Sequence, residues 1–399
     1  RFFFSCNCFL STWCSFFTRY NFDCSGYFKR RWKLDLTELS NSAFTNSLLT
    51  WYKEHKREMP WRGEKDPYKI WISEIMLQQT KVDQAWPYFE NFMAKFPTVY
   101  DLANADQQKV LKAWEGLGYY SRARNLHAAS KMIVENYGGK LPEAYDEIIK
   151  LKGIGPYTAA AITSIAFGKP NAVVDGNVIR VITRYYGIKE DVRKTGTVKQ
   201  VQSLVNELIS HKKPAEFNQG MMELGATICS PQKPDCFNCP IQSGCIATKI
   251  AKTDSIPYKS KAKKKPHKVI GVGIIEAEDG KLLIALRPED AMLGGLWEFP
   301  GGKQEKGESI QQTIERELQE ELGVEVHAYK EFMNLKHTYS HFSITMHAWF
   351  CTLISGTPKP KSSQEIRWVK RSELEEYPFP KANKVLTEKL IGDKLNSER

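Results

Sequence analysis

Four cysteines near the middle of the chain constrain its fold more than any other feature. They lie in the segment ATICSPQKPDCFNCPIQSGC with the spacing C-x6-C-x2-C-x5-C, and they are Cys229, Cys236, Cys239 and Cys245. The prolines and polar residues between them suit a tight loop around a metal better than a packed helix. Four thiolates can bind either a [4Fe–4S] cluster or a structural zinc ion, and the spacing alone does not choose between the two.

A Gly-x-Gly turn lies upstream of these cysteines. The sequence LKGIGPYTA, residues 151–159, separates two stretches with helical apolar periodicity, which predicts two helices joined by a tight turn. Gly153 and Gly155 permit backbone conformations that other residues avoid, and amides at the start of the second helix can hold a phosphate. By itself, such a turn is more often a plain connection between helices. Further on, Asp175 precedes a glycine, where an aspartate commonly caps a helix.

Taken together, the turn, the aspartate and the four-cysteine loop resemble the helix-hairpin-helix DNA glycosylases that carry an iron–sulfur cluster. The resemblance covers residues 37–250 and implies a [4Fe–4S] cluster held by the four cysteines. The segments MPWRG, WISEIMLQQT and AWEGLGYYSRARNLH are similar to the MutY branch, the adenine glycosylases. Tyr157 stands where the endonuclease III branch has a lysine. Because imine chemistry needs an amine, the resemblance implies a glycosylase without a lyase step.

Cleavage of an N-glycosidic bond builds positive charge on the sugar and negative charge on the departing base, so it needs an acid and an anion. The resemblance implies that Glu74 is the acid and Asp175 the stabilising carboxylate, with Tyr157 and Asn177 orienting the reacting groups. Glu74 lies among apolar residues, so we expect burial to raise its pKa and keep it protonated. Without the family context, a helical glutamate is more often exposed.

The target base must leave the duplex before it can react. The resemblance implies that Arg62 and Trp61 contact the flipped base, and that Gln79 and Tyr119 enter the vacated base stack. The implied partner is double-stranded DNA containing adenine opposite 8-oxoguanine or guanine. We expect the protein to act as a monomer and not to associate with a membrane.

Composition agrees with this interpretation. The chain has 399 residues, which suggests two or three domains, and its formal net charge of +11 suits a polyanionic partner. Four of its nine cysteines fall in one metal-type loop, which favours a reducing compartment, and we expect the bacterial cytoplasm. The predicted divisions are a 1–36 extension unrelated to function, a 37–250 glycosylase domain, a 251–267 basic linker and a 268–399 domain.

The second domain begins with a change of pattern at Val269. VIGVGIIEAEDGKLLIAL predicts two strands around an Asp-Gly turn, and FSITMHAWFCTLIS predicts another strand. From Gly302, GKQEKGESIQQTIERELQEELGV is a complete Nudix box, with Glu317, Glu320 and Glu321 on one helical face. Three such carboxylates can hold Mg²⁺ against a diphosphate.

In the adenine glycosylases, a Nudix-like domain of this kind recognises 8-oxoguanine and does not hydrolyse nucleotides. The segment HTYSHFS resembles the loop that touches the lesion. The resemblance implies that Ser340 contacts 8-oxoguanine and that Tyr339 and His341 shape the loop.

We therefore expect a multidomain protein, with an all-α helix-hairpin-helix glycosylase domain and its iron–sulfur loop followed by an α/β Nudix-like domain. Two alternatives remain open. The first is an endonuclease III-like glycosylase/lyase, which Tyr157 disfavours. The second is a bifunctional protein whose intact Nudix box hydrolyses oxidised nucleoside triphosphates. A catalytically inactive DNA-binding module is disfavoured because Glu74 and Asp175 are both present.

Overall fold

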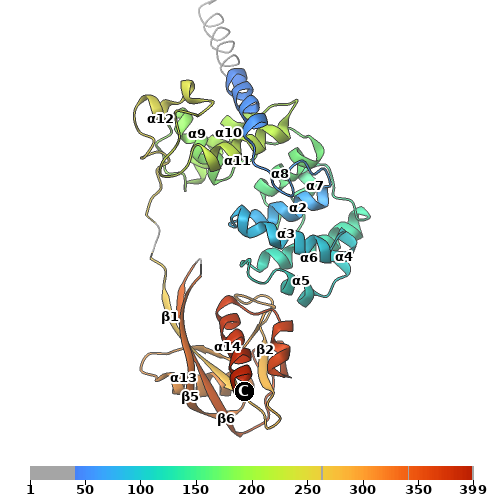
Figure 1. The fold of residues 1–399 in the computed structure, drawn as a ribbon, viewed down its shortest axis with the longest axis vertical. Helices are drawn as coiled ribbons and strands as arrows, with labels where there is room; N and C mark the ends of the chain where they lie inside the picture. Colours follow the sequence, from blue (N-terminus) through green and yellow to red (C-terminus); the bar gives the residue numbers. More distant parts are fainter. Residues whose placement is uncertain (1–40, 262–263, 340, 398–399) are drawn as a thin grey trace, which may run out of the picture.

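The computed structural model describes residues 41–261, 264–339 and 341–397, and side chains only as far as residue 392 in the last helix. A helical domain (residues 41–249) and a sheet domain (residues 267–397) are joined by a connector (Figure 1). This arrangement confirms the predicted order of an all-α part followed by an α/β part. The predicted extension, residues 1–36, lies outside the described residues. Within the described ranges, no helix combines the length and apolarity that crossing a bilayer requires.

The helical domain begins with a helix over residues 41–55. Its other elements are α2 (Pro67–Leu77), α3 (Val82–Lys95), α4 (Val99–Asn104), α5 (Gln107–Ala113), α6 (Ser121–Tyr137), α7 (Tyr145–Ile148), α8 (Pro156–Phe167), α9 (Gly176–Tyr186), α10 (Thr195–Leu208), α11 (Pro214–Thr227), the 3-10 turn η1 (Gln242–Gly244) and α12 (Ile246–Lys249).

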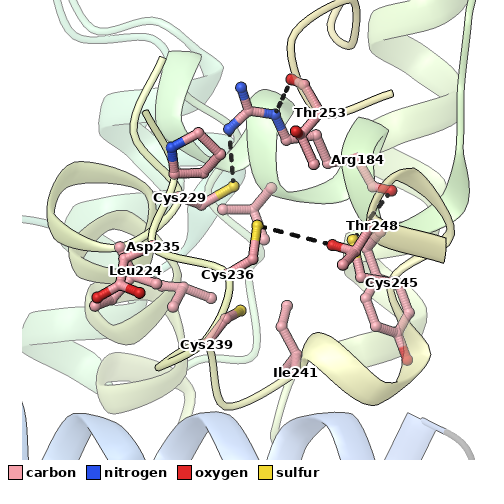
Figure 2. A pocket seen from close by; sticks show the side chains of 14 residues that line it. Arg184, Leu224, Cys229, Asp235, Cys236, Cys239, Ile241, Cys245, Thr248 and Thr253 are labelled. Carbon is pink, nitrogen blue, oxygen red and sulfur yellow. Dashed lines mark hydrogen bonds between the residues drawn. The ribbon is translucent and has the colours of Figure 1, made fainter. Parts of the chain in front are cut away.

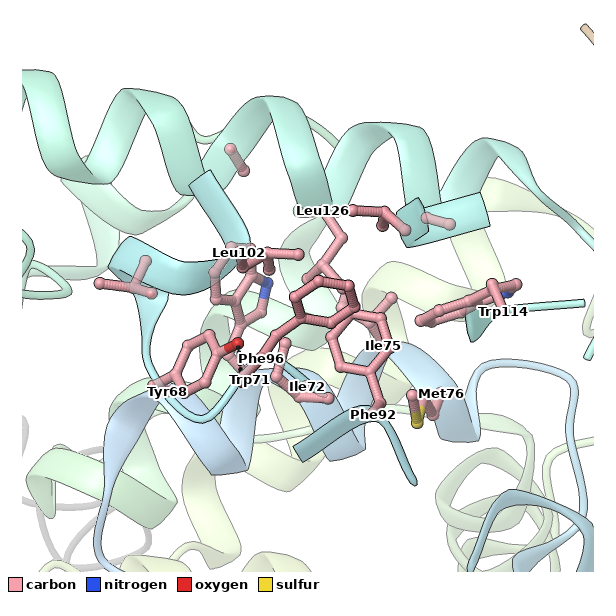
Figure 3. Close-up of a cluster of buried hydrophobic side chains, with 14 of the residues drawn as sticks. Tyr68, Trp71, Ile72, Ile75, Met76, Phe92, Phe96, Leu102, Trp114 and Leu126 are labelled. Carbon is pink, nitrogen blue, oxygen red and sulfur yellow. Dashed lines mark hydrogen bonds between the residues drawn. The ribbon is translucent and has the colours of Figure 1, made fainter. Parts of the chain in front are cut away.

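Helix α2 runs through the core of this domain. Asp66 begins it by accepting a hydrogen bond from the Tyr68 amide, and Pro67 takes the first helical position, where its missing N–H costs nothing. Eight of its residues are buried, and five of them belong to a cluster with Phe92, Trp114 and Leu126 (Figure 3). Because the helix is buried on nearly all sides, a polar side chain at its centre lies in protein rather than in water.

The Gly-x-Gly turn joins two helices, as its sequence predicts. The first, α7, is a single turn and shorter than the apolar stretch suggests. Gly153 has φ +80°, a conformation that favours glycine, and a Cβ placed there would lie 2.5 Å from the Asn125 Cβ on α6. Gly155 is the N-cap of α8 and has ordinary dihedral angles. The turn is therefore packed tightly against α6 at Gly153 alone.

The sheet domain contains two sheets. Its elements are β1 (His267–Ile275), β2 (Leu282–Leu286), β3 (Trp297–Glu298), β4 (Gly301–Lys303), α13 (Ile310–Leu322), β5 (Glu325–Thr338), β6 (Ser343–Ser355), β7 (Glu365–Val369), η2 (Arg371–Glu376) and α14 (Lys381–Ser397). One sheet has the order β4-β1-β6-β5 and the other β3-β2-β7. Strand β1 is parallel to β6 and antiparallel to β4.

The segment VIGVGIIEAEDGKLLIAL forms two strands, as predicted, but they diverge after one bridge, between Glu276 and Leu282, and enter different sheets. Both strands contribute apolar residues to two cores. Ile314, Leu318 and Leu322 of α13 pack over one core, and Leu386 and Leu390 of α14 pack in the other.

The connector is anchored at its start. Ile256 is 2 % exposed, and the Arg184 guanidinium donates hydrogen bonds to the carbonyls of Thr253 and Ile256. The Val192 amide donates to the Tyr258 carbonyl. The basic segment expected to act as a linker is thus attached to the helical domain as far as residue 258.

We predict that Gly153→Ala destabilises the helical domain by about 1–3 kcal/mol, because alanine is strained at φ +80° and its Cβ meets Asn125. Gly155→Ala is the matched control, since a Cβ placed at Gly155 meets open space. Urea unfolding followed by helical circular dichroism measures both. Equal midpoints for the two variants would contradict this account of the turn.

Candidate functional site

A cavity of about 190 Å³ in the helical domain collects residues from five helices and two loops. Its lining consists of Arg57, Met59, Trp61, Arg62, Glu74, Leu77, Thr80, Val82, Tyr157, Asp175, Asn177, Gln219, Met222, Glu223 and Ala226. Glu74 and Asp175 lie 101 positions apart in the sequence and share this cavity. The four residues proposed for chemistry are thereby brought together.

Glu74 is the most deeply buried carboxyl group of the paired site. It is 5 % exposed, and the Tyr157 hydroxyl donates a hydrogen bond of 2.9 Å to its Oε2. Burial raises the pKa of Glu74 to about 7, although the Tyr157 hydrogen bond opposes the shift, and the negative charge of Asp175 adds to it. A substantial fraction of Glu74 is therefore protonated near neutral pH.

Asp175 has a more polar environment. It is the N-cap of α9, where its Oδ1 accepts from the Val178 amide at 2.7 Å and its Oδ2 accepts from Asn177 Nδ2 at 2.9 Å. Burial raises the pKa of Asp175, while these hydrogen bonds and the nearby Arg180 oppose that rise. Capping and a place in the cavity are thus compatible roles for one aspartate.

Asn177 links Asp175 to the cysteine loop. Its Oδ1 accepts from Arg180 Nη2 at 2.8 Å, and Arg180 also donates to the carbonyls of Cys229 and Gly225 at 2.7 Å. Sequence analysis missed Arg180, although its position one helical turn after Asn177 was a usable signal.

The four cysteines line one pocket between α9, α11 and α12 (Figure 2). Arg184 reaches into it and donates to Cys229 Sγ at 3.3 Å, and Thr248 Oγ1 lies 3.8 Å from Cys236 Sγ. Among the described residues, no three His, Cys, Asp or Glu side chains are already arranged to hold a single metal ion.

Glu223 is a site residue that sequence analysis missed. It is 2 % exposed and accepts from Arg57 Nε at 2.6 Å and from Arg62 Nη2 at 2.9 Å. Burial raises the pKa of Glu223, but the two arginines outweigh that effect and hold it below its usual value. Its signal was a lone carboxylate in the apolar segment MMELGA. The ion pair with Glu223 fixes Arg62 on the cavity wall, beside Trp61.

Gln79 and Tyr119 lie outside this cavity, and both have left-handed backbones, with φ +59° and +50°. Arg122 lies between them. Its guanidinium donates to the carbonyl of Gln78, the residue before Gln79, at 2.6 Å. It also donates to the carbonyl of Gly118, the residue before Tyr119, at 3.1 Å. One buried arginine therefore holds both strained residues, and such strain is energetically costly for non-glycine residues and common at functional sites.

A second cavity, of about 340 Å³, lies between the domains; we call it the interdomain cavity. It is lined by Tyr119 from the helical domain and by Tyr339 and His341 from the sheet domain. The Tyr339 ring stacks on Phe342 at 4.9 Å, and its amide donates to the Phe342 carbonyl. Ser340 lies outside the described residues.

The glycines of the hairpin do not line the first cavity. Gly153 faces a separate cavity with Gln78, Arg122, Asn125 and Lys152, and Gly155 caps α8. Their proposed phosphate contact would therefore be made apart from the paired carboxylates.

The Nudix box forms the loop before α13 and the helix itself. Arg316 pairs with Glu308 at 2.6 Å, with Glu317 at 3.0 Å and with Glu320 at 3.3 Å. Glu321 accepts instead from the Gly301 amide. The three glutamates lie on one helical face, as predicted, and Arg316 of the box neutralises part of their negative charge.

Comparison with known proteins agrees with both domains. The family model for the HhH-GPD superfamily of base excision DNA repair proteins matches residues 72–209, and the NUDIX domain model matches residues 271–389. The solved structure of a thermostable thymine-DNA glycosylase is similar to 54 % of this chain and 99 % of its own, with TM-score 0.50 and 31 % identity.

Two curated relatives extend across both domains. The adenine DNA glycosylase of Homo sapiens is 33 % identical over 85 % of this chain and 72 % of its own length. That of Buchnera aphidicola subsp. Acyrthosiphon pisum (strain APS) is 35 % identical over 76 % of this chain and 85 % of its own. The chain belongs to the adenine DNA glycosylase family.

Proposed function

We propose that the protein removes adenine paired with 8-oxoguanine or guanine from double-stranded DNA, by hydrolysis of the N-glycosidic bond. The observation that carries the proposal is the pair Glu74 and Asp175, which face one cavity in contrasting environments. Family membership supports the reaction class. The division of roles between the two carboxyl groups rests on their surroundings.

Glu74 acts as the acid. Its raised pKa keeps a proton available at neutral pH, and the Tyr157 hydroxyl occupies Oε2, which leaves Oε1 for the base. Proton transfer to a ring nitrogen of adenine makes the base a better leaving group. General acid catalysis of this kind contributes about 10²–10⁴-fold in rate.

Asp175 stabilises the positive charge that develops on the sugar. The hydrogen bonds from Val178 and Asn177 favour its anionic form and fix its two oxygens. A fixed anion at a low-dielectric site interacts strongly with an oxocarbenium-like sugar. Water then completes the hydrolysis at the sugar.

The chain has no amine where a lyase would need one. Tyr157 lies in the hairpin beside Glu74, and its phenol cannot form an imine with the deoxyribose. Monofunctional base removal is therefore favoured over an endonuclease III-like lyase.

Recognition of the substrate uses both domains. Arg62, held by Glu223, and Trp61 form a wall suited to a purine edge and face. Gln79 and Tyr119 are suited to enter the stack that the flipped adenine vacates. The interdomain cavity is suited to receive the opposite base, between Tyr119 and the loop of Tyr339 and His341, with Ser340 next to both in sequence.

We predict that Glu74→Gln and Asp175→Asn each reduce adenine excision at least about 10²-fold while DNA binding is retained, because each variant keeps the side-chain shape and loses one chemical role. Single-turnover excision from an A:8-oxoguanine duplex, with A:G and A:C duplexes for comparison, measures the effect. The exposed Glu90→Gln on α3 is the control. Near-normal excision by either variant would exclude this mechanism.

We propose that the four cysteines hold a [4Fe–4S] cluster. Its donors are four thiols around one pocket, and Arg184 at Cys229 Sγ complements the negative charge that thiolate ligation brings. Such a cluster would tie the loop to α9 and α11, and through Arg180 and Asn177 it would support Asp175. We assign it no part in breaking the bond.

We predict about four irons and matching sulfide per chain in protein purified without oxygen. Cys236→Ser should lose iron and destabilise the loop, since metal binding is coupled to folding. Cys351→Ala is the control, because Cys351 is buried in the sheet domain and should leave iron content unchanged. Stoichiometric zinc without iron in the wild-type protein would contradict the assignment.

A further inference from the structure

Two side chains of the helical domain bind the backbone of Phe379 in the sheet domain, one at its amide and one at its carbonyl. The Phe379 amide donates to Glu115 Oε1 at 2.9 Å, and the Phe379 carbonyl accepts from the Tyr120 hydroxyl at 3.2 Å. Phe379 is 1 % exposed and its ring stacks on Phe299 in the sheet-domain core. The contact therefore extends from the helical domain into the packed interior of its neighbour.

The second oxygen of Glu115 binds two lysines, one from each domain. Its Oε2 lies 2.8 Å from Lys112 Nζ and 2.7 Å from Lys384 Nζ. Glu115 is only 8 % exposed; burial raises its pKa, yet the hydrogen bonds from the lysines and from Phe379 outweigh this and hold it below the usual value. Because the Glu115 carboxylate is buried while the lysines are only partly so, loss of the lysines would leave an uncompensated buried charge.

Glu115 and Tyr120 also flank the turn that carries Tyr119. Between them, Gly116 and Gly118 have φ +103° and +73°, so the turn depends on a sequence of left-handed residues. The Gly116 amide donates to the Tyr120 hydroxyl at 3.3 Å, which ties the turn to the same contact. Binding of Phe379 thus restrains both ends of the Tyr119 turn.

Further contacts join the domains elsewhere. Gln108 donates to the Gly295 carbonyl and accepts from Trp297 Nε1, and Leu296 packs in the helical-domain core. The Gln108 contacts dock the sheet domain at α5 rather than at the two ends of the Tyr119 turn.

We propose that Glu115 is a positioning residue that couples docking of the sheet domain to the conformation of the Tyr119 turn, and so sets the preference for the base opposite adenine. The inference rests on the proposed function. Docking brings Tyr339 and His341 to the interdomain cavity, and the same contact fixes Tyr119 on its other wall. Glu115 does not line that cavity and acts on the opposite base only through the turn.

The test compares single-turnover excision from A:8-oxoguanine and A:G duplexes by the full chain and by Glu115→Gln. The variant keeps one amide oxygen for the Phe379 N–H and loses the charge that holds both lysines. We expect the ratio of the two rates to fall roughly tenfold, as for typical coupling between sites, with A:G excision nearly unchanged. Hydrogen exchange of peptides covering residues 116–120 and 377–384 should quicken together.

Two matched variants make the result specific. Glu276→Gln removes a carboxylate paired with Arg371 at 3.0 Å inside the sheet domain and should leave the ratio unchanged. Lys384→Met should lower the ratio, and adding it to Glu115→Gln should cost less than the two single effects combined, because both break one interaction.

Two further variants extend the test. Glu115→Asp, which keeps the charge, should restore part of the ratio. If Glu115→Gln fails to fold, Tyr120→Phe tests the same contact by removing one hydroxyl.

The outcomes separate this inference from the function on which it rests. A wild-type chain that does not excise adenine would refute the proposed function. A wild-type chain that prefers 8-oxoguanine, with an unchanged ratio in Glu115→Gln despite faster exchange at 377–384, would overturn the coupling alone. An equal fall of both rates would likewise overturn it, since that would show a general structural role.

Discussion

The burial of Glu74 in α2 is the constraint on which the proposed active site depends. A carboxyl group inside a helix that is packed on nearly all sides loses its hydration, and the anion becomes unfavourable. Tyr157, from the hairpin, donates one hydrogen bond to the Glu74 carboxyl group. Several such bonds would be needed to stabilise the Glu74 anion. The same packing that stabilises the helical domain thereby produces an acid that holds its proton near neutrality.

Asp175, in the same cavity, accepts more hydrogen bonds than Glu74 does. Its position at the start of α9 gives it an amide hydrogen bond, and Asn177 supplies another. Arg180 continues this network to the carbonyl of Cys229, so the cysteine loop supports the residue proposed to face the sugar. Burial raises the pKa of both carboxyl groups, and more hydrogen bonds oppose that rise at Asp175 than at Glu74. The interdomain contact at Glu115 is proposed to act on the opposite base.

Apolar periodicity and motif spacing predicted the order of the domains and the two helices of the hairpin, because both are local properties, whereas only the family resemblance named the four residues that share the cavity. They did not predict that β1 and β2 separate into two sheets, since strand pairing is decided by distant partners such as β6 and β7. Glu223, Arg122 and Glu115 were also missed. Each acts through at least one partner far away in the sequence, and the lone carboxylate in MMELGA, the one signal for Glu223, does not name the arginines that bind it.

If Glu74 must carry a proton for excision, the pH dependence of single-turnover excision will show it. The protonated form predominates below its pKa, so the rate should be highest on the acid side and fall as pH rises through about 7. Tyr157→Phe removes a hydrogen bond that lowers this pKa, so the fall should move to higher pH. A rate that stays constant across this region, or that rises with pH, would contradict the account.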